Sequence, residues 1–185
     1  MSARKYLTDY IIEDQLDPKT GRLKSVAVYT GKWFCFVHDA ETMRRLRLRC
    51  FAATASCAVF FIAGLLTAAP CCRTMYVILP YAVLEFPIFY AAAGCLRLKR
   101  AEGPIKREHR DKIANRLPTA ALLILIFSAV SAVGCIVRAF VTGMTARDII
   151  FLLCAAAMAA SGGLLLSQRR LLAPEETGIS GKNAG

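Results

Sequence analysis

Glu85 is the one acidic residue inside a long apolar stretch of the chain, and a proline lies on either side of it. Pro80 and Pro87 lack a backbone N–H, so each leaves a carbonyl without its helical partner. A carboxyl group beside unpaired carbonyls, deep in apolar sequence, is a pattern that can line a path for protons or cations. The nearest charged residues, Arg73 and Arg97, are each twelve positions away, so Glu85 is expected near the middle of a membrane-spanning helix.

Two other roles are open for Glu85. A charged carboxylate at the centre of a bilayer costs at least ~2.5 kcal/mol, so the group could instead stay neutral and share a hydrogen bond with a hydroxyl. Tyr81, four residues earlier on the same expected face, and Ser128, near the middle of the third apolar segment, are the predicted partners. Arg138 lies too close to the outer end of its segment to be the counter-ion. The remaining role is a contact with a partner subunit.

Eight cysteines are the other reactive groups of the chain. Only Cys71 and Cys72 are expected on the outer side of a membrane, and because they are adjacent they do not form a disulfide scaffold. We predict that most of the thiols are small apolar packing groups, with a Cys71–Cys72 redox pair or an intersubunit disulfide as the alternative. No C-x-x-C occurs, and His38 and His109 complete no zinc-ligand spacing.

Catalytic and cofactor motifs are absent from the sequence. There is no Gly-rich phosphate loop, no G-x-S-x-G and no H-E-x-x-H, and the acidic residues near the N-terminus are too dispersed for a calcium loop. His38 beside Asp39 is interpreted as an exposed histidine next to a helix cap. We therefore predict a non-enzymatic protein without a catalytic residue, cofactor or metal.

The elements that position these residues follow from the distribution of charge. Of 185 residues, 56% are hydrophobic and 20% are charged. Apart from Glu85, four segments of 20 or more residues carry no charge, which is enough to span a ~30 Å hydrocarbon core. They are apolar all round, whereas helices of a soluble bundle keep a polar face. The expected spans are approximately residues 50–70, 75–96, 117–140 and 147–168.

The net charge of +11 predicts the orientation. Alternating the connections between two sides places 21 Lys and Arg on one side and 3 on the other. Basic residues are retained in the cytoplasm, so both termini and the loop 97–116 are expected there, in a bacterial cytoplasmic membrane. No cleavable signal peptide is predicted, and a nucleic-acid partner is disfavoured because the charges lie beside the span ends.

Residues 1–38 are expected to form a β-rich cytoplasmic segment. A turn over Asp17–Gly21 joins two strands within 6–16 and 22–29, and Trp33–Val37 reads as a third strand of the same meander. The third strand is apolar on both faces. It either packs on its own chain or presents a binding surface to a partner.

A helix beginning after Asp39 is predicted to continue into the first span. Arg44, Arg45, Arg47 and Arg49 would then lie at the depth of the lipid headgroups and contact them, or simply stop translocation. Residues 39–172 form the expected transmembrane domain, and residues 173–185 are expected to be a flexible cytoplasmic tail.

Small residues predict how the spans pack. Ala155, Ala159 and Gly163 recur at every fourth position of span four, a spacing that lets helix backbones approach closely. Two short outer connections favour two helical hairpins, with a capping pattern from Thr145 to Asp148 and Pro118 in the first turn of span three. The stripe serves either a compact four-helix bundle or self-association.

The expected fold is thus an all-α membrane protein of four transmembrane helices with a small cytoplasmic β segment. The lipid bilayer is its predicted environment, and another membrane protein or a second copy is its predicted partner. The leading functional hypothesis is an accessory, assembly or regulatory protein. The alternative is a small oligomeric transporter or channel that uses Glu85.

Overall fold

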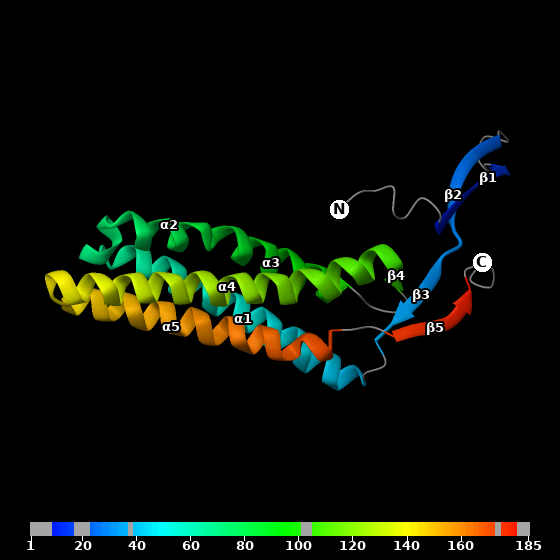
Figure 1. The fold of residues 1–185 in the computed structure, drawn as a ribbon. Coiled ribbons are helices and arrows are strands. Elements are labelled where there is room, and N and C mark those ends of the chain that lie inside the picture. The colour runs from blue at the N-terminus through cyan, green and yellow to red at the C-terminus, as the bar shows by residue number, and fades with distance from the viewer. Residues whose placement is uncertain (1–8, 17–22, 37–38, 101–104, 173–174, 181–185) are drawn as a thin grey trace.

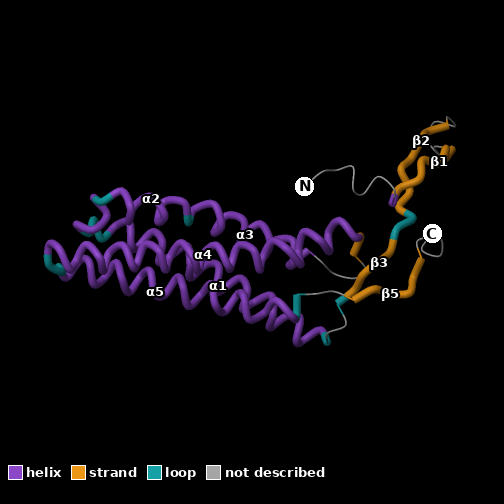
Figure 2. Tube along the Cα trace, in the orientation of Figure 1, coloured by secondary structure: helices purple, strands orange, loops and turns teal. Residues whose placement is uncertain are grey.

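Long helices run side by side, and short strands gather at one end of them (Figure 1). The computed structural model describes residues 9–16, 23–36, 39–100, 105–172 and 175–180. The distribution of helix and strand along the chain is visible in Figure 2. The helices are α1 (Ala40–Leu66), α2 (Met75–Val83), α3 (Glu85–Arg100), α4 (Arg107–Thr142) and α5 (Ala146–Ser167), with short 3-10 turns η2 (Pro70–Arg73) and η3 (Gln168–Arg170).

Four helical stretches are long and apolar enough to cross a membrane by length and composition. They are Ala40–Leu66, Met75–Lys99, Arg107–Thr142 and Ala146–Arg170. α1 begins at Ala40 and continues without a break through the arginine cluster, which confirms the helix predicted to begin after Asp39. Asp39 holds the N-cap position, but its side chain makes no capping hydrogen bond.

The second span is interrupted. Its helix ends at Val83, a turn occupies Leu84, and a new helix starts at Glu85. The Leu84 amide bonds the Tyr81 carbonyl, three residues back, at 3.1 Å, as in a 3-10 turn. Pro87 explains the break, because it has no N–H to offer the Val83 carbonyl. Pro80, in contrast, lies inside α2.

The third span starts earlier than its apolar segment. α4 begins at Arg107, so much of the expected loop 97–116 is helical, as are the last residues of α3. Arg, Lys, Glu and Ala are good helix formers, and a helix can continue beyond the apolar layer into water. Pro118 consequently lies inside the helix and not in its first turn, which corrects the prediction from sequence.

The N-terminal strands form the predicted hairpin. β1 (Tyr10–Leu16) pairs antiparallel with β2 (Leu23–Tyr29), with Tyr10 opposite Tyr29. The predicted turn over Asp17–Gly21 lies outside the described residues. The Tyr29 hydroxyl donates to the Lys32 carbonyl at 2.9 Å and accepts from the Arg107 amide at 3.1 Å, so it joins the hairpin to the start of α4. Burial raises the pKa of this phenol.

The third strand does not continue the hairpin as a meander, which corrects a second prediction. β3 (Lys32–Cys35) lies at the centre of another sheet, between β4 (Ile105–Lys106) and β5 (Glu175–Ser180), and both pairings are antiparallel. Part of the expected flexible tail is thus a strand. A local pattern identifies a strand but not its partners, because those come from segments far along the chain.

Phe34 shows what covers this apolar strand. It is 3% exposed, pairs with Ile105 in the sheet and lies under the Arg110 guanidinium, 4.3 Å from the ring centroid. Phe34 is therefore covered by its own chain, whereas Trp33, Cys35 and Phe36 are half-buried; Val37 lies outside the described residues.

The helices enclose one apolar core. α5 packs along α1 and α4, α3 packs on α1 and α4, and α2 packs on α4. Tyr81 lies at the centre of the core, with its ring stacked on Phe61 and tilted against Phe151 at centroid distances of 5.2 and 4.8 Å. The outward faces of the same helices carry many exposed large apolar side chains, which suits a lipid environment.

Candidate functional site

Glu85 occupies the first turn of α3, on the outside of the bundle. Its side chain is exposed, as are the neighbouring Leu79, Phe86 and Phe89, so the carboxyl group lies on an otherwise apolar surface. The sequence identified this residue, and the structure adds the direction in which it faces.

The expected partners of Glu85 face the other way. Tyr81 is 0% exposed, and its hydroxyl contacts the Phe60 and Phe61 carbonyls at 3.3 and 3.0 Å. Ser128 is also buried and donates to the Leu125 carbonyl at 3.1 Å. The buried side chains Tyr81, Leu84 and Ile88 follow one helical stripe, and Glu85 lies just beyond its edge, on the exposed side. Pro80 and Pro87 are buried on the inner side.

The small-residue stripe of α5 is only partly used in packing. Ala155 is buried, but Ala159 is half-buried, and a Cβ added at Gly163 would meet no atom within 4 Å. The close approach is made instead by Gly162, whose added Cβ would lie 3.1 Å from the Ala121 carbonyl oxygen on α4. The stripe predicted from spacing is thus displaced by one residue from the observed contact.

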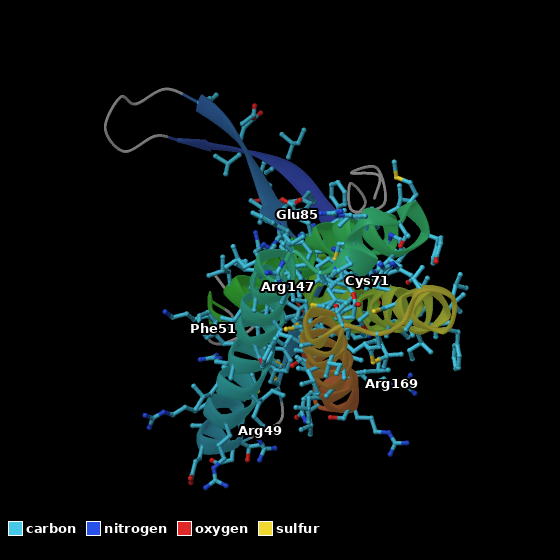
Figure 3. The ribbon with its side chains drawn as sticks, turned by 90° about the vertical axis from the view of Figure 1, so that its left-hand side faces the viewer. Arg49, Phe51, Cys71, Glu85, Arg147 and Arg169 are labelled. Atoms are coloured by element: carbon cyan, nitrogen blue, oxygen red, sulfur yellow. The ribbon has the colours of Figure 1, made fainter. Side chains whose placement is uncertain are left out.

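The arginines of α1 lie at the end of the bundle that carries the strands. Arg44, Arg45 and Arg49 are exposed and Arg47 is half-buried. Arg45 forms an ion pair with Glu41 one turn earlier, and Arg49, labelled in Figure 3, lines a groove between α1 and α5. A groove of about 440 Å³ opens between α1 and α3. Its lining residues are Arg44, Arg47, Leu48, Phe51, Cys95, Leu96 and Lys99.

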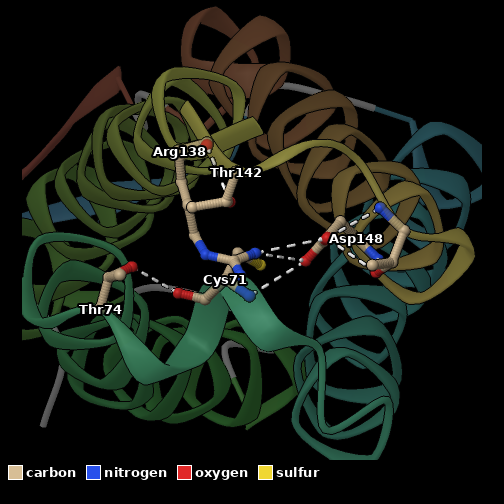
Figure 4. A network of polar contacts seen from close by, with 6 residues as sticks. Cys71, Thr74, Arg138, Thr142 and Asp148 are labelled. Carbon is tan, nitrogen blue, oxygen red and sulfur yellow. Dashed lines mark hydrogen bonds and ion pairs between the residues drawn. The ribbon is translucent and has the colours of Figure 1, made fainter. Parts of the chain in front are cut away.

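A buried polar cluster lies at the opposite end of the bundle and is centred on Asp148 (Figure 4). Asp148 is 1% exposed. Its Oδ2 accepts from the Thr145 amide at 3.1 Å and the Thr145 hydroxyl at 2.7 Å, while the Asp148 amide donates to Thr145 Oγ1 at 3.3 Å. This confirms the capping pattern predicted at the start of span four.

Arg138 completes the charge balance of this cluster. Its guanidinium nitrogen lies 3.4 Å from Oδ2 and 3.5 Å from Oδ1 of Asp148, and its side chain is only 17% exposed. The sequence placed Arg138 at the outer end of its span but identified no partner for it. The short connection between α4 and α5 was the signal available, because it brings residues on either side of the turn together.

Two cysteines adjoin the same carboxylate. Cys71, in η2, donates its backbone N–H to Asp148 Oδ1 at 3.0 Å. Its thiol, the Cys135 thiol on α4 and a carboxylate oxygen of Asp148 all lie within 4.8 Å of one another, and all three residues are buried. Burial, reinforced by its neighbours, strongly raises the pKa of the Cys71 thiol. Cysteine spacing could not predict this group, because its members come from three separate segments.

The known proteins offer no analogy for these features. No protein-family model, curated protein or solved structure matches this chain. The assignment of function therefore rests on the geometry of the two regions, the outward-facing Glu85 and the buried cluster around Asp148.

Proposed function

We propose that the chain is a multi-pass membrane protein with an accessory, assembly or regulatory role, and that the surface around Glu85 contacts another membrane protein. The observation that carries this proposal is an exposed carboxyl group on an apolar helical surface. A charged carboxylate that faces lipid has an unfavourable free energy, because the hydrocarbon layer does not solvate it. A neighbouring helix that offers a donor or a basic side chain removes that cost.

The placement in the membrane has its own support. β3 precedes the first apolar helix, β4 lies between the second and third, and β5 follows the fourth, yet all three share one sheet. Strands of one sheet lie on the same side of a membrane, so the chain must cross the membrane an even number of times between any two of them. The segments at this end also hold most of the Lys and Arg residues, which favours the cytoplasmic side for both termini.

The alternative of an oligomeric transporter or channel needs Glu85 to face a path. Within the described residues, Tyr81 and Ser128 turn their hydroxyls to backbone carbonyls, so they offer Glu85 no polar route through one bundle. Such a path would have to lie between copies. This makes the identity of the neighbour at Glu85 the observation that separates the two functions.

Site-specific photo-crosslinking in native membranes tests the proposal. A photoreactive amino acid at Phe86 or Phe89, beside Glu85, is expected to capture one defined membrane protein. The matched control is Leu153 on α5, which is 65% exposed against 72% for Phe89 and is expected to capture lipid.

Substitution of Glu85 sharpens the same experiment. Glu85→Ala is expected to abolish the crosslink, and Glu85→Gln to retain part of it, because the amide still forms hydrogen bonds. A crosslink to a second copy of this chain favours the oligomeric alternative. Equal crosslinking at Phe89 and Leu153, unchanged by Glu85→Ala, contradicts both.

A further inference from the structure

We propose that Cys71, Cys135 and Asp148 bind a zinc ion at the end of the bundle remote from the strands. Two thiolates and a carboxylate form a ligand set that zinc accepts in proteins. The residues come from η2, α4 and α5, so the ion would fasten the connection between the first two spans to the second pair of helices.

The spacing of the ligand atoms suits a tetrahedral ion. The two sulfurs and a carboxylate oxygen lie within 4.8 Å of one another. Zinc–sulfur bonds of about 2.3 Å at tetrahedral angles place two sulfurs ~3.8 Å apart, so the group needs to contract by only ~1 Å. All three residues are buried, and this limits competition from water for the coordination positions.

The carboxylate is already held in a fixed orientation. Thr145 donates twice to Oδ2 and the Cys71 amide donates once to Oδ1, at distances of 3.1 Å or less. Oδ1 accepts from the Cys71 amide and, at 3.5 Å, from Arg138, which also contacts Oδ2, so a metal on Oδ1 would displace only the longer of the two Arg138 contacts. Such supporting hydrogen bonds are the partners that orient metal ligands in known sites.

Charge balance favours a divalent ion. Zn²⁺ with two thiolates and the Asp148 carboxylate carries a net charge of −1, and the Arg138 guanidinium 3.4 Å from Oδ2 brings the site to neutrality. A neutral group avoids most of the cost of burying charge in an apolar bundle. The two thiol protons leave to solvent as the metal–sulfur bonds form.

Cys72 offers a fourth ligand and a route to the site. It is half-buried, follows Cys71 directly, and its thiol lies within hydrogen-bonding reach of the Cys71 thiol. Rotation of this side chain would fill the last tetrahedral position and leave the site with one net negative charge, whereas a water molecule in that position keeps it neutral. The bundle end is open to solvent on this side, so the ion need not cross the apolar core.

Metal analysis of the purified full chain tests the proposal. Protein extracted in detergent without chelators is expected to contain about one zinc per chain. After removal of zinc, Co²⁺ is expected to bind and give the intense near-ultraviolet absorption of a thiolate–cobalt bond. Cys71→Ser and Cys135→Ser are each expected to weaken Zn²⁺ binding by at least about tenfold. Cys57→Ser and Cys154→Ser, buried elsewhere in the bundle, should not.

The thermal midpoint separates a metal site from a packing role. Zn²⁺ is expected to raise the midpoint of the wild-type protein but not that of Cys135→Ser, while the two metal-free proteins unfold at similar temperatures. If Cys135→Ser does not fold, Cys71→Ser provides the same comparison. Reduced, folded wild-type protein that binds neither Zn²⁺ nor Co²⁺ overturns the proposal, as does a Cys71–Cys135 disulfide in protein from native membranes.

Discussion

Arg138 and Asp148 form an ion pair of 3.4 Å across the turn between α4 and α5, where each is the charge partner of the other. The two side chains differ in their access to water: Asp148 is 1% exposed, while Arg138 is 17% exposed near a helix end. Asp148 also caps α5 through Thr145. One carboxylate therefore starts a helix, neutralises an arginine and anchors the Cys71 amide.

Removal of Arg138 should cost more stability than removal of its partner. Arg138→Ala leaves a buried, uncompensated carboxylate and is expected to cost about 3 kcal/mol. Asp148→Ala loses the helix cap, about 1–2 kcal/mol, and the acceptor of the buried Cys71 amide, about 1 kcal/mol, but it frees an arginine that can turn towards water. Thermal unfolding in lipid nanodiscs should show the double variant to be more stable than Arg138→Ala alone.

The control for these single and double variants is Arg147→Ala. Arg147 is exposed at the same turn (Figure 3), so its removal should change the stability little. Additive losses in the double variant would show that the two side chains do not act as a pair.

Gly64 gives a second test, through the position of the Tyr81 ring. A Cβ at Gly64 would lie 2.1 Å from the Tyr81 hydroxyl oxygen, and the ring cannot yield easily between Phe61 and Phe151. Gly64→Ala is expected to destabilise the bundle by about 1–3 kcal/mol. Adding Tyr81→Phe removes the clashing oxygen and should recover part of the loss, measured by thermal unfolding.

Gly163→Ala is the matched control for Gly64→Ala. Both glycines lie in helices, but the space beside Gly163 is open, so alanine there should be neutral or stabilising by up to about 1 kcal/mol. Equal destabilisation at both glycines would mean that the contact with Tyr81 is not the cause.

Residue patterns within one segment were predictable from sequence. The apolar lengths, the hairpin of β1 and β2, and the Thr145–Asp148 cap all depend on neighbours a few positions apart. The side on which Glu85 lies was not, because positions four apart differ by about 40° around a helix, and the edge of the buried stripe falls between Tyr81 and Glu85.

Contacts between distant segments could not be predicted from such local patterns. The pairing of β3 with β4 and β5, and the approach of Cys71 to Cys135, bring together residues more than sixty positions apart. Nothing in the local sequence of Cys71 distinguishes it from a packing cysteine. Short turns bring whole helices side by side, and the periodicity of a sequence does not show which residues of two helices then meet.

The shared sheet predicts that the two chain ends lie on the same side of the membrane. A fluorescent reporter that folds only in the cytoplasm should be active when fused after Gly185. A phosphatase reporter active only outside should be inactive there and active when fused within the η2 connection, after Arg73. Phosphatase activity after Gly185 would contradict the four-span arrangement.

The groove between α1 and α3 is expected to bind an anionic phospholipid, with the phosphate at Arg44 and Lys99 and an acyl chain along Leu48 and Phe51. Each basic residue near a membrane surface contributes about 1 kcal/mol to such binding, so Arg44→Gln should lower the affinity for phosphatidylglycerol about fivefold. Native mass spectrometry of the protein with phosphatidylglycerol and phosphatidylcholine measures the preference.

Arg45→Gln is the control, because Arg45 pairs with Glu41 and does not line the groove. An equal loss in both variants would indicate attraction to the arginine cluster as a whole, and not to the groove.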